Sequence, residues 1–390
     1  MIGNTKLLVI IPDRISSILK KGEYPERYYN PENLFDEVHI LMTNKDKPDL
    51  SALQKTVGDA KLYLYNLPFT YKDFFFSLGM QPWALKQWTQ PGLDLARKII
   101  PQLVRCHGDG LNAFLAYRIK NELGIPYVVS IHTAREDHLP GKTKKISNSL
   151  VHALLLPIRR LSLRGADIVL PVYKSAVPFL KNIGVKRYEV AYNVINPKYL
   201  RKKKRYELHD PVSIVYVGRL NEHKNPVMII LALKSINHGH LTIIGDGPLR
   251  PELERLSNEN RLSKRISFVP ALPNDELCEL LPEFDIFAIH SNHSEIPKTL
   301  LEALLTGLPC IVNQRTGNPV PELQAAPILM VNNSVEGYAT GIRNLIDDDS
   351  LRSQLGRKAK AHASKHWAPS KTEARYAAIY KEILYKVRKP

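Results

Sequence analysis

The chain has 390 residues, of which 44% are hydrophobic, and it carries a formal net charge of +17. This length fits two domains, and no apolar run approaches the roughly 20 residues that span a bilayer. The three cysteines, Cys106, Cys278 and Cys310, are far apart. They fit a reducing compartment, and no Cys/His spacing indicates zinc. These features predict a cytoplasmic, globular protein of two domains without a metal site.

The excess of positive charge has three interpretations. The plainest is a solvated surface that keeps the protein soluble. The other two are an anionic membrane surface and nucleic acid as partners. The sequence carries no signature of a nucleic-acid-binding fold, so we expect no nucleic acid and favour a peripheral position on the inner face of the membrane.

The first half of the chain alternates short apolar runs with helical patterns. The first run reads as a strand rather than as a signal peptide. Strands are predicted at 6–12, 37–42, 61–65, 103–106, 127–131 and 167–172, with a helix at 111–123. This alternation predicts a doubly wound α/β domain with a parallel sheet.

Two of these strands end at a histidine, His107 and His132. Strand ends of a doubly wound sheet form its ligand-binding edge. A lone histidine there is more often structural than functional, but two in consecutive turns are candidate site residues. The aromatic stretch 66–92 predicts core packing under a helix, with an acceptor-binding lip as the alternative.

A basic, leucine-rich stretch covers residues 142–164. It predicts either a surface helix packed on the sheet or a segment that docks on acidic lipid. Pro157 is expected to interrupt or kink that helix. The basic run 201–205 indicates a solvated linker, so we place the domain boundary at about residue 200.

The second half follows the same alternation. Strands are predicted at 213–217, 241–244, 266–269, 286–289, 309–312 and 327–331, and helices at 226–234, 249–260, 275–281, 335–347 and 350–365. Asn274 or Asp275 is expected to cap the helix at 275–281.

The central stretch of the second half is residues 285–312. A helix there has Pro297 in its first turn and ends at Gly307. The N–H groups around Pro297, Lys298 and Thr299 are expected to face the crevice at the strand ends, where an anion binds well. Glu302 lies inside the same helix.

The motif SEIPKTLLEALLTGLPCIV, from Ser294 to Val312, resembles the signature of the bacterial-type, family-4 retaining glycosyltransferases of the GT-B fold. In that family two glutamates are separated by seven residues. Glu302 matches the second, which holds the ribose hydroxyls of a nucleotide-sugar. Counting back eight residues gives Ser294, and Glu295 is one residue late, so either could take the contact with the donor sugar.

Other segments extend the resemblance. Gly218, Arg219 and Lys224 match the half of the signature in which two cations converge on a diphosphate. His132 matches a family histidine near the donor sugar. The glycine pair that many members carry after the first strand is replaced by Pro12-Asp13-Arg14.

The resemblance implies two Rossmann-like domains facing each other across a cleft, residues 1–200 and 201–369, with the first completed by a helix at about 370–390. It implies a retaining, metal-independent hexosyltransferase of EC class 2.4, without a cofactor. The donor would be a UDP- or GDP-sugar and the acceptor a glycan or a lipid-linked molecule, in cell-surface polysaccharide or glycolipid biosynthesis.

Each candidate residue has an expected role in that reaction. The catalytic set is His132, Arg219, Lys224 and Glu295. The donor-binding set is Gly218, Ser294, Ile296, Pro297, Lys298, Thr299, Glu302 and Pro270, and the acceptor side includes His107 and Arg14. Two alternatives stay open: a non-catalytic GT-B member that binds nucleotide-sugar, which the displaced glutamate favours slightly, and a nucleotide-sugar epimerase or hydrolase.

Overall fold

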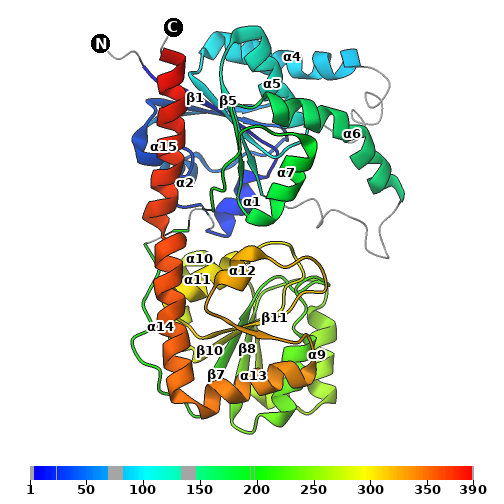
Figure 1. The fold of residues 1–390 in the computed structure, drawn as a ribbon, viewed down its shortest axis with the longest axis vertical. Coiled ribbons are helices and arrows are strands. Elements are labelled where there is room, and N and C mark those ends of the chain that lie inside the picture. Colours follow the sequence, from blue (N-terminus) through cyan, green and yellow to red (C-terminus); the bar gives the residue numbers. More distant parts are fainter. Residues whose placement is uncertain are drawn as a thin grey trace. The chain divides into compact units, whose positions relative to one another are not determined.

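The computed structural model divides the chain into two compact units, each with its own parallel sheet (Figure 1). Unit 1 comprises Met1–Lys20, Tyr24–Val194 and Ser370–Pro390, and unit 2 comprises Lys21–Glu23 and Ile195–Pro369. The structure describes residues 4–22, 24–68, 82–132, 146–193, 195–196 and 198–388.

The sheet of unit 1 has six parallel strands in the order β3-β2-β1-β4-β5-β6. They are β1 (Lys6–Ile11), β2 (Glu37–Met42), β3 (Lys61–Asn66), β4 (Leu103–His107), β5 (Tyr127–Ile131) and β6 (Ile168–Pro171). The order reverses between β1 and β4, which is where doubly wound sheets bind ligands.

The helices of unit 1 cover both faces of its sheet. They are α1 (Ile15–Lys20), α2 (Leu50–Gln54), α4 (Pro82–Ile99), α5 (Leu111–Leu123), α6 (Ile146–Gly165), α7 (Val177–Ile183) and α15 (Pro369–Arg388). The C-terminal helix α15 buries Tyr376 and Tyr380 against β1, whereas α5 buries Leu115 and Ile119 against the opposite face. Both faces of the sheet are therefore apolar, as parallel sheets require.

Two local expectations for unit 1 need comment. Helix α6 runs through Pro157, so the proline does not interrupt the helix, and a kink there stays a prediction. The segment between β1 and β2 contains the short helix α1. Residues 69–81 of the aromatic stretch are outside the described residues, and 82–92 belong to α4.

Unit 2 repeats the architecture with the order β12-β11-β10-β7-β8-β9, again all parallel. Its strands are β7 (Val212–Val217), β8 (Gly239–Ile244), β9 (Ile266–Val269), β10 (Ile286–Ile289), β11 (Cys310–Asn313) and β12 (Leu329–Val331). The order reverses between β7 and β10. The prediction of two doubly wound α/β domains is confirmed.

The helices of unit 2 follow the predicted positions closely. They are α8 (Val227–Ala232), α9 (Arg250–Glu259), α10 (Asn274–Leu280), α11 (Lys298–Thr306), α12 (Pro321–Ala325), α13 (Val335–Asp347) and α14 (Asp349–His366). The expected cap of α10 is wrong: Pro273 occupies the cap position without a side-chain bond, and Asn274 is the first helical residue. The Asn274 side chain is therefore available for another role.

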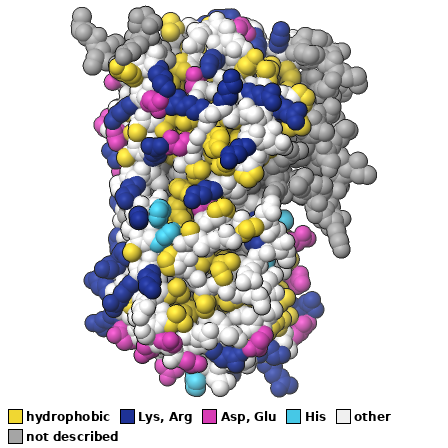
Figure 2. Space-filling model, in the orientation of Figure 1, with side chains coloured by type: hydrophobic (Ala, Val, Ile, Leu, Met, Phe, Trp, Pro, Cys, Tyr) yellow, Lys and Arg dark blue, Asp and Glu magenta, His cyan; other side chains and the backbone are white. Residues whose placement is uncertain are grey.

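Lys and Arg side chains are scattered over the surface. Figure 2 shows Lys and Arg side chains over both units on the visible face. In the part of the chain that the structure describes, no helix is both long enough and apolar enough to cross a bilayer.

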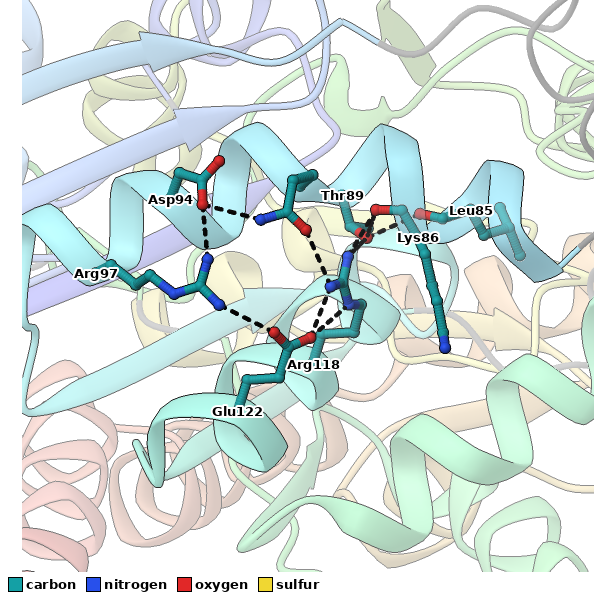
Figure 3. Close-up of polar contacts among 8 residues, drawn as sticks. Leu85, Lys86, Thr89, Asp94, Arg97, Arg118 and Glu122 are labelled. Carbon is teal, nitrogen blue, oxygen red and sulfur yellow. Dashed lines mark hydrogen bonds and ion pairs between the residues drawn. The ribbon is translucent and has the colours of Figure 1, made fainter.

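A buried arginine joins α4 to α5 (Figure 3). Arg118 is 9% exposed. Its guanidinium donates to the carbonyl of Lys86 and the hydroxyl of Thr89, each at 2.6 Å, and to Oε1 of Glu122 at 2.6 Å. Arg97 approaches the other carboxylate oxygen of Glu122 at 3.1 Å. Planar guanidinium donors satisfy several buried acceptors at once, so Arg118 fixes how the two helices pack.

We expect Arg118→Met to lower the free energy of unfolding by about 2–4 kcal/mol, because it removes the guanidinium bonds to Lys86, Thr89 and Glu122 in a buried setting. The control is Arg97→Met. Its side chain is 45% exposed, so removing its ion pair should cost less than about 1 kcal/mol. Urea denaturation of both variants measures the difference, and equal losses would contradict the assigned role of Arg118.

Candidate functional site

The turn after β7 is built around Asn221. Its side-chain oxygen accepts from the backbone N–H groups of His223 and Lys224, both at 3.1 Å. The hydroxyl of Tyr216 donates to the carbonyl of Lys224 at 2.7 Å. These bonds hold both the N–H and the carbonyl of Lys224, so the turn fixes the backbone position of this residue.

The turns after β7 and β8 approach so closely that only glycine fits at two positions. A Cβ on Gly245 would lie 2.0 Å from the carbonyl oxygen of Gly218, and one on Gly247 would lie 2.1 Å from that of Leu220. Gly245 also has φ +148°, in the region that side chains disfavour. The backbone N–H of Leu220 donates to the carbonyl of Asp246 at 3.0 Å, which joins the two turns.

The central stretch brings a helix N-terminus to the same edge. His290 directly follows strand β10, and its Nδ1 accepts from the backbone N–H of Asn225 at 3.1 Å. Thr299, in the first turn of α11, donates its hydroxyl to the carbonyl of Val217 at 3.1 Å. Helix α11 ends at Gly307 in the left-handed conformation, as the sequence predicts. The first N–H groups of α11 therefore lie beside the end of β7.

These elements enclose a cavity of about 550 Å³ at the carboxyl ends of β7, β8 and β9. From unit 2 its lining includes Val217, Gly218, Arg219, Lys224, Ile244, Gly245, Asp246, Gly247, Pro248, Ala271, Leu272, Asn274, Leu277, Lys298, Thr299 and Glu302. Gly218, Arg219, Lys224, Lys298, Thr299 and Glu302 were predicted as site residues. The structure therefore brings together residues that are more than 80 positions apart in the sequence.

One part of the cavity is cationic. Arg219 is exposed and Lys224 is half-buried. Among the described residues, neither side chain forms a hydrogen bond or ion pair. Lys298 and the N-terminal end of α11 add further positive potential. Cations without carboxylate partners beside a helix N-terminus form a site for an anion.

Another part of the cavity is apolar. Ala271 and Leu272 follow β9, and Leu277 faces the same space from α10. Pro270 was predicted here, but the lining begins one residue later, at Ala271. An apolar wall near a cationic one suits a ligand with a flat ring system and a charged group.

A pair of buried polar side chains completes the lining. Glu302 is fully buried on α11 and Asn274 is 6% exposed on α10. The amide Nδ2 of Asn274 donates to Oε1 of Glu302 at 2.6 Å. Two helices that are distant in the sequence thus meet through one side-chain hydrogen bond.

Several predicted residues of unit 2 do not line this cavity. Ser294, Ile296 and Pro297 are buried, and Glu295 is half-buried. The Ser294 hydroxyl accepts from the guanidinium of Arg315 at 2.9 Å. The two candidates for the displaced glutamate therefore differ in environment, since Ser294 faces an arginine from the turn after β11.

The predicted residues of unit 1 form a separate group. His107 is the last residue of β4 and His132 directly follows β5. Their rings stack with centroids 5.4 Å apart and planes 12° apart. In each ring, Nε2 is buried and has no hydrogen-bond partner among the described residues. Arg14 is exposed in the turn after β1, next to α1. The structure thus pairs the histidines that the strand pattern singled out.

A buried cation lies behind this histidine pair. Arg105 on β4 is 1% exposed and donates to the carbonyl of Tyr28 at 2.8 Å. Its guanidinium lies 4.9 Å from the ring centroid of Tyr28 and 5.0 Å from that of Tyr376 on α15. The negative faces of tyrosine rings stabilise a cation in such a cage. Tyr29, next to Tyr28 in the segment between β1 and β2, is fully buried in the core of unit 1.

Burial keeps these histidines neutral. It lowers the pKa of His132 to about 4, with the charge of Arg105 acting in the same direction. Burial lowers the pKa of His107 well below its ordinary range, again with help from Arg105. In unit 2, burial and then His223 lower the pKa of His290 to about 4. Neutral imidazoles can donate one hydrogen bond and accept another.

The whole chain should lose stability as the pH falls from about 6.5 toward 4. In that window the unfolded chain binds protons that the buried histidines exclude, so protons favour unfolding. His132→Gln should reduce the loss by up to about 1.4 kcal/mol per pH unit. His238→Gln, whose side chain is 82% exposed, is the control and should leave the pH dependence unchanged. Urea denaturation at pH 7, 6 and 5 gives the free energy of unfolding of each protein. If that free energy changes with pH equally in the wild type and in His132→Gln, the prediction is refuted.

Comparisons with known proteins agree with this architecture. Residues 200–362 match the model of the family described as glycosyl transferases group 1. The sulfoquinovosyl transferase SQD2 of Arabidopsis thaliana is 23% identical over 357 residues, which cover 87% of this chain and 66% of that relative, just under two thirds. The lipopolysaccharide core biosynthesis glycosyltransferase LpsD of Rhizobium meliloti is 30% identical over 45% of this chain and 52% of its own length.

Among solved structures, HepE of Anabaena in complex with UDP superposes with a TM-score of 0.71 at 15% identity. The match covers 97% of this chain and all of that one. Two parallel-sheet units of this kind define the GT-B class of protein. The two units therefore have the GT-B fold, and residues 200–362, which lie in unit 2, match the glycosyl transferases group 1 family. The resemblance inferred from the sequence motif is confirmed at this level.

Sequence reasoning missed two residues that the structure makes prominent. Asn274 was interpreted only as a possible helix cap. Its bond to Glu302 joins positions 28 residues apart, so no local sequence pattern points to it. Arg105 lies within an apolar strand, and only the tertiary fold surrounds it with tyrosines. A charged residue in the middle of a predicted buried strand was the available signal for Arg105.

Proposed function

We propose that this glycosyltransferase moves a hexose from a UDP- or GDP-sugar to a glycan or lipid-linked acceptor, with retention of anomeric configuration. The observation that carries the proposal is the 550 Å³ cavity, in which Arg219, Lys224 and Lys298 lie near Glu302 and an apolar wall. The UDP bound to the Anabaena structure supports a uridine nucleotide as the first donor to test.

The cations would act on the leaving group. As the glycosidic bond breaks, negative charge grows on the nucleoside diphosphate, and fixed positive groups stabilise that charge. A guanidinium offers paired hydrogen bonds and an ammonium a compact charge. The N-terminal end of α11 adds its dipole. We propose that these groups make a metal ion unnecessary.

The remaining candidates would contact the two sugars. We propose that Glu295 takes the contact with the donor sugar, because the Ser294 hydroxyl already accepts from Arg315. Unit 1 would bind the acceptor, with Arg14 and His107 on that side. His132 would contact the donor sugar as a neutral hydrogen-bonding group. Retention through a front-face path, in which the leaving phosphate helps deprotonate the acceptor, follows from the family resemblance alone.

Replacing either cation should abolish most of the turnover. Arg219→Ala and Lys224→Ala should each lower kcat by about 10²–10³-fold, because each removes a group that opposes leaving-group charge. Neither side chain has a partner in the described residues, so both variants should fold normally. Arg255→Ala, on the surface of α9, is the control.

The measurement has three steps. A thermal-shift screen against UDP-, GDP- and ADP-sugars identifies the donor, product analysis follows transfer to glycan and lipid acceptors, and NMR of the product assigns the anomer. Normal turnover in both cation variants would refute the assignment. Turnover of the donor without any acceptor would instead indicate an epimerase or hydrolase, and binding without turnover a non-catalytic member.

For the membrane, we propose an anionic lipid surface as partner, bound through a surface of unit 2. We name it the α14 basic surface: Lys202, Arg357 and Lys360. Arg357 lies 5.9 Å from the ring centroid of Tyr206, which packs beside α14. Burial lowers the pKa of Lys360, and the nearby charge of Lys202 lowers it further. Figure 2 shows Lys and Arg gathered along this side of unit 2.

The sequence supports this surface over helix α6. Residues 350–366 contain no Asp or Glu, and neither do residues 196–206, although Glu279 from α10 pairs with Arg201 at 2.9 Å. In α6, by contrast, Arg159 lies 3.4 Å from Asp109 and its side chain is only 13% exposed. Helix α6 also packs on α5.

Neutralising the α14 basic surface should weaken membrane binding. The triple variant Lys202→Gln, Arg357→Gln, Lys360→Gln should sediment with vesicles containing phosphatidylserine at least 10-fold less well, since each basic residue near such a surface contributes about 1 kcal/mol. The matched control removes the same charge elsewhere in unit 2: Lys234→Gln, Arg255→Gln, Lys264→Gln. Equal binding by the two triple variants, or binding that is insensitive to salt, would disprove the surface.

A further inference from the structure

The strongest unexplained feature of the cavity is the amide of Asn274. Asn274 is the first residue of α10, lines the cavity and is 6% exposed. Its Nδ2 donates to Glu302 at 2.6 Å. Its Oδ1 is buried and has no hydrogen-bond partner among the described residues.

The orientation of this amide follows from chemistry. A carboxylate only accepts hydrogen bonds, so the NH₂ group of Asn274 must face Glu302 and the oxygen must face away. Buried polar atoms in folded proteins nearly always have a partner. The same side chain lines the cavity, so a ligand bound there could supply the missing donor.

The position of the pair indicates which donor it is. Lys298 and Glu302 are four residues apart and therefore lie on the same face of α11. Asn274 and Leu277 are three residues apart and lie on the same face of α10. The two acceptors therefore lie one helical turn from a phosphate-binding cation and one turn from the apolar wall. In a nucleotide, the ribose lies between the phosphates and the base, and its two neighbouring hydroxyls are donors.

We propose that Asn274 and Glu302 together form a recognition site for the vicinal diol of the ribose. Asn274 fixes the Glu302 carboxylate in place and accepts a second hydroxyl with its own Oδ1. This inference rests on the proposed function, because it requires a nucleotide in this cavity. It adds a positioning and binding residue from α10 that the motif on α11 does not contain.

Binding of nucleoside diphosphates to the full chain tests the inference. Isothermal titration calorimetry is run with UDP, GDP and ADP, and then with the 2′-deoxy and 3′-deoxy forms of whichever binds. The wild-type protein should prefer the ribonucleotide by about 10–100-fold, because a missing hydroxyl leaves a buried acceptor unpaired.

Two variants separate recognition from stability. Asn274→Ala should reduce the preference for ribose at least 5-fold while changing the affinity for the deoxy analogue less than 3-fold, a pattern that a merely structural defect would not produce. Asn274→Asp keeps the shape but cannot donate to Glu302 when ionised, and should weaken ribonucleotide binding at least 10-fold. Asn260→Ala, remote from the cavity lining, is the matched control and should bind like the wild type.

The outcomes show separately whether the proposed function or the role of Asn274 is wrong. If the wild-type protein binds none of the nucleotides, the proposed function fails and the diol site with it. If it binds one, but Asn274→Ala and Asn274→Asp keep the wild-type preference for ribose, the donor proposal stands and the role of Asn274 is wrong.

Discussion

The site in unit 2 depends on a close approach between two backbone turns. With Gly245 and Gly247 against the carbonyls of Gly218 and Leu220, the turns after β7 and β8 leave no space for a Cβ. Any side chain there would separate the turns and displace the backbone that carries Arg219. The lack of space for a side chain at Gly245 and Gly247 thus determines where Arg219 lies. Thr299 completes the arrangement by tying α11 to the end of β7.

Two kinds of polar group in the cavity lack a partner among the described residues. The side chains of Arg219 and Lys224 form no hydrogen bond or ion pair, and Oδ1 of Asn274 is buried without a partner. Buried polar atoms without a partner also occur away from the cavity, for example Nε of Arg105 and Oγ of Ser257. Arg118, by contrast, satisfies acceptors on two helices. The convergence of cations on one cavity therefore supports a binding site more strongly than an unpaired atom does by itself.

In unit 1, the buried cation Arg105 has a different kind of partner. Arg105 is surrounded by tyrosine rings rather than by carboxylates, so its charge is stabilised without being neutralised. Its field reaches His107 and His132 and adds to the burial that lowers their pKa. One of the enclosing rings, Tyr376, comes from the C-terminal helix α15. The far end of the chain therefore contributes to the environment of the histidines at the sheet edge.

The sequence by itself determined the fold class and the position of most elements, because buried parallel strands are continuous apolar runs and glycine marks helix ends. It predicted β5 and β10 to the residue, and it singled out Glu302, Arg219 and Lys224 from local motifs. Only the tertiary structure decided that Asn274 bonds to Glu302 rather than capping α10, and that tyrosines enclose Arg105. Both contacts join segments far apart in the chain. Both contacts are strengthened by the low dielectric of the packed interior, which exists only once the layers have packed, so no local pattern could encode them.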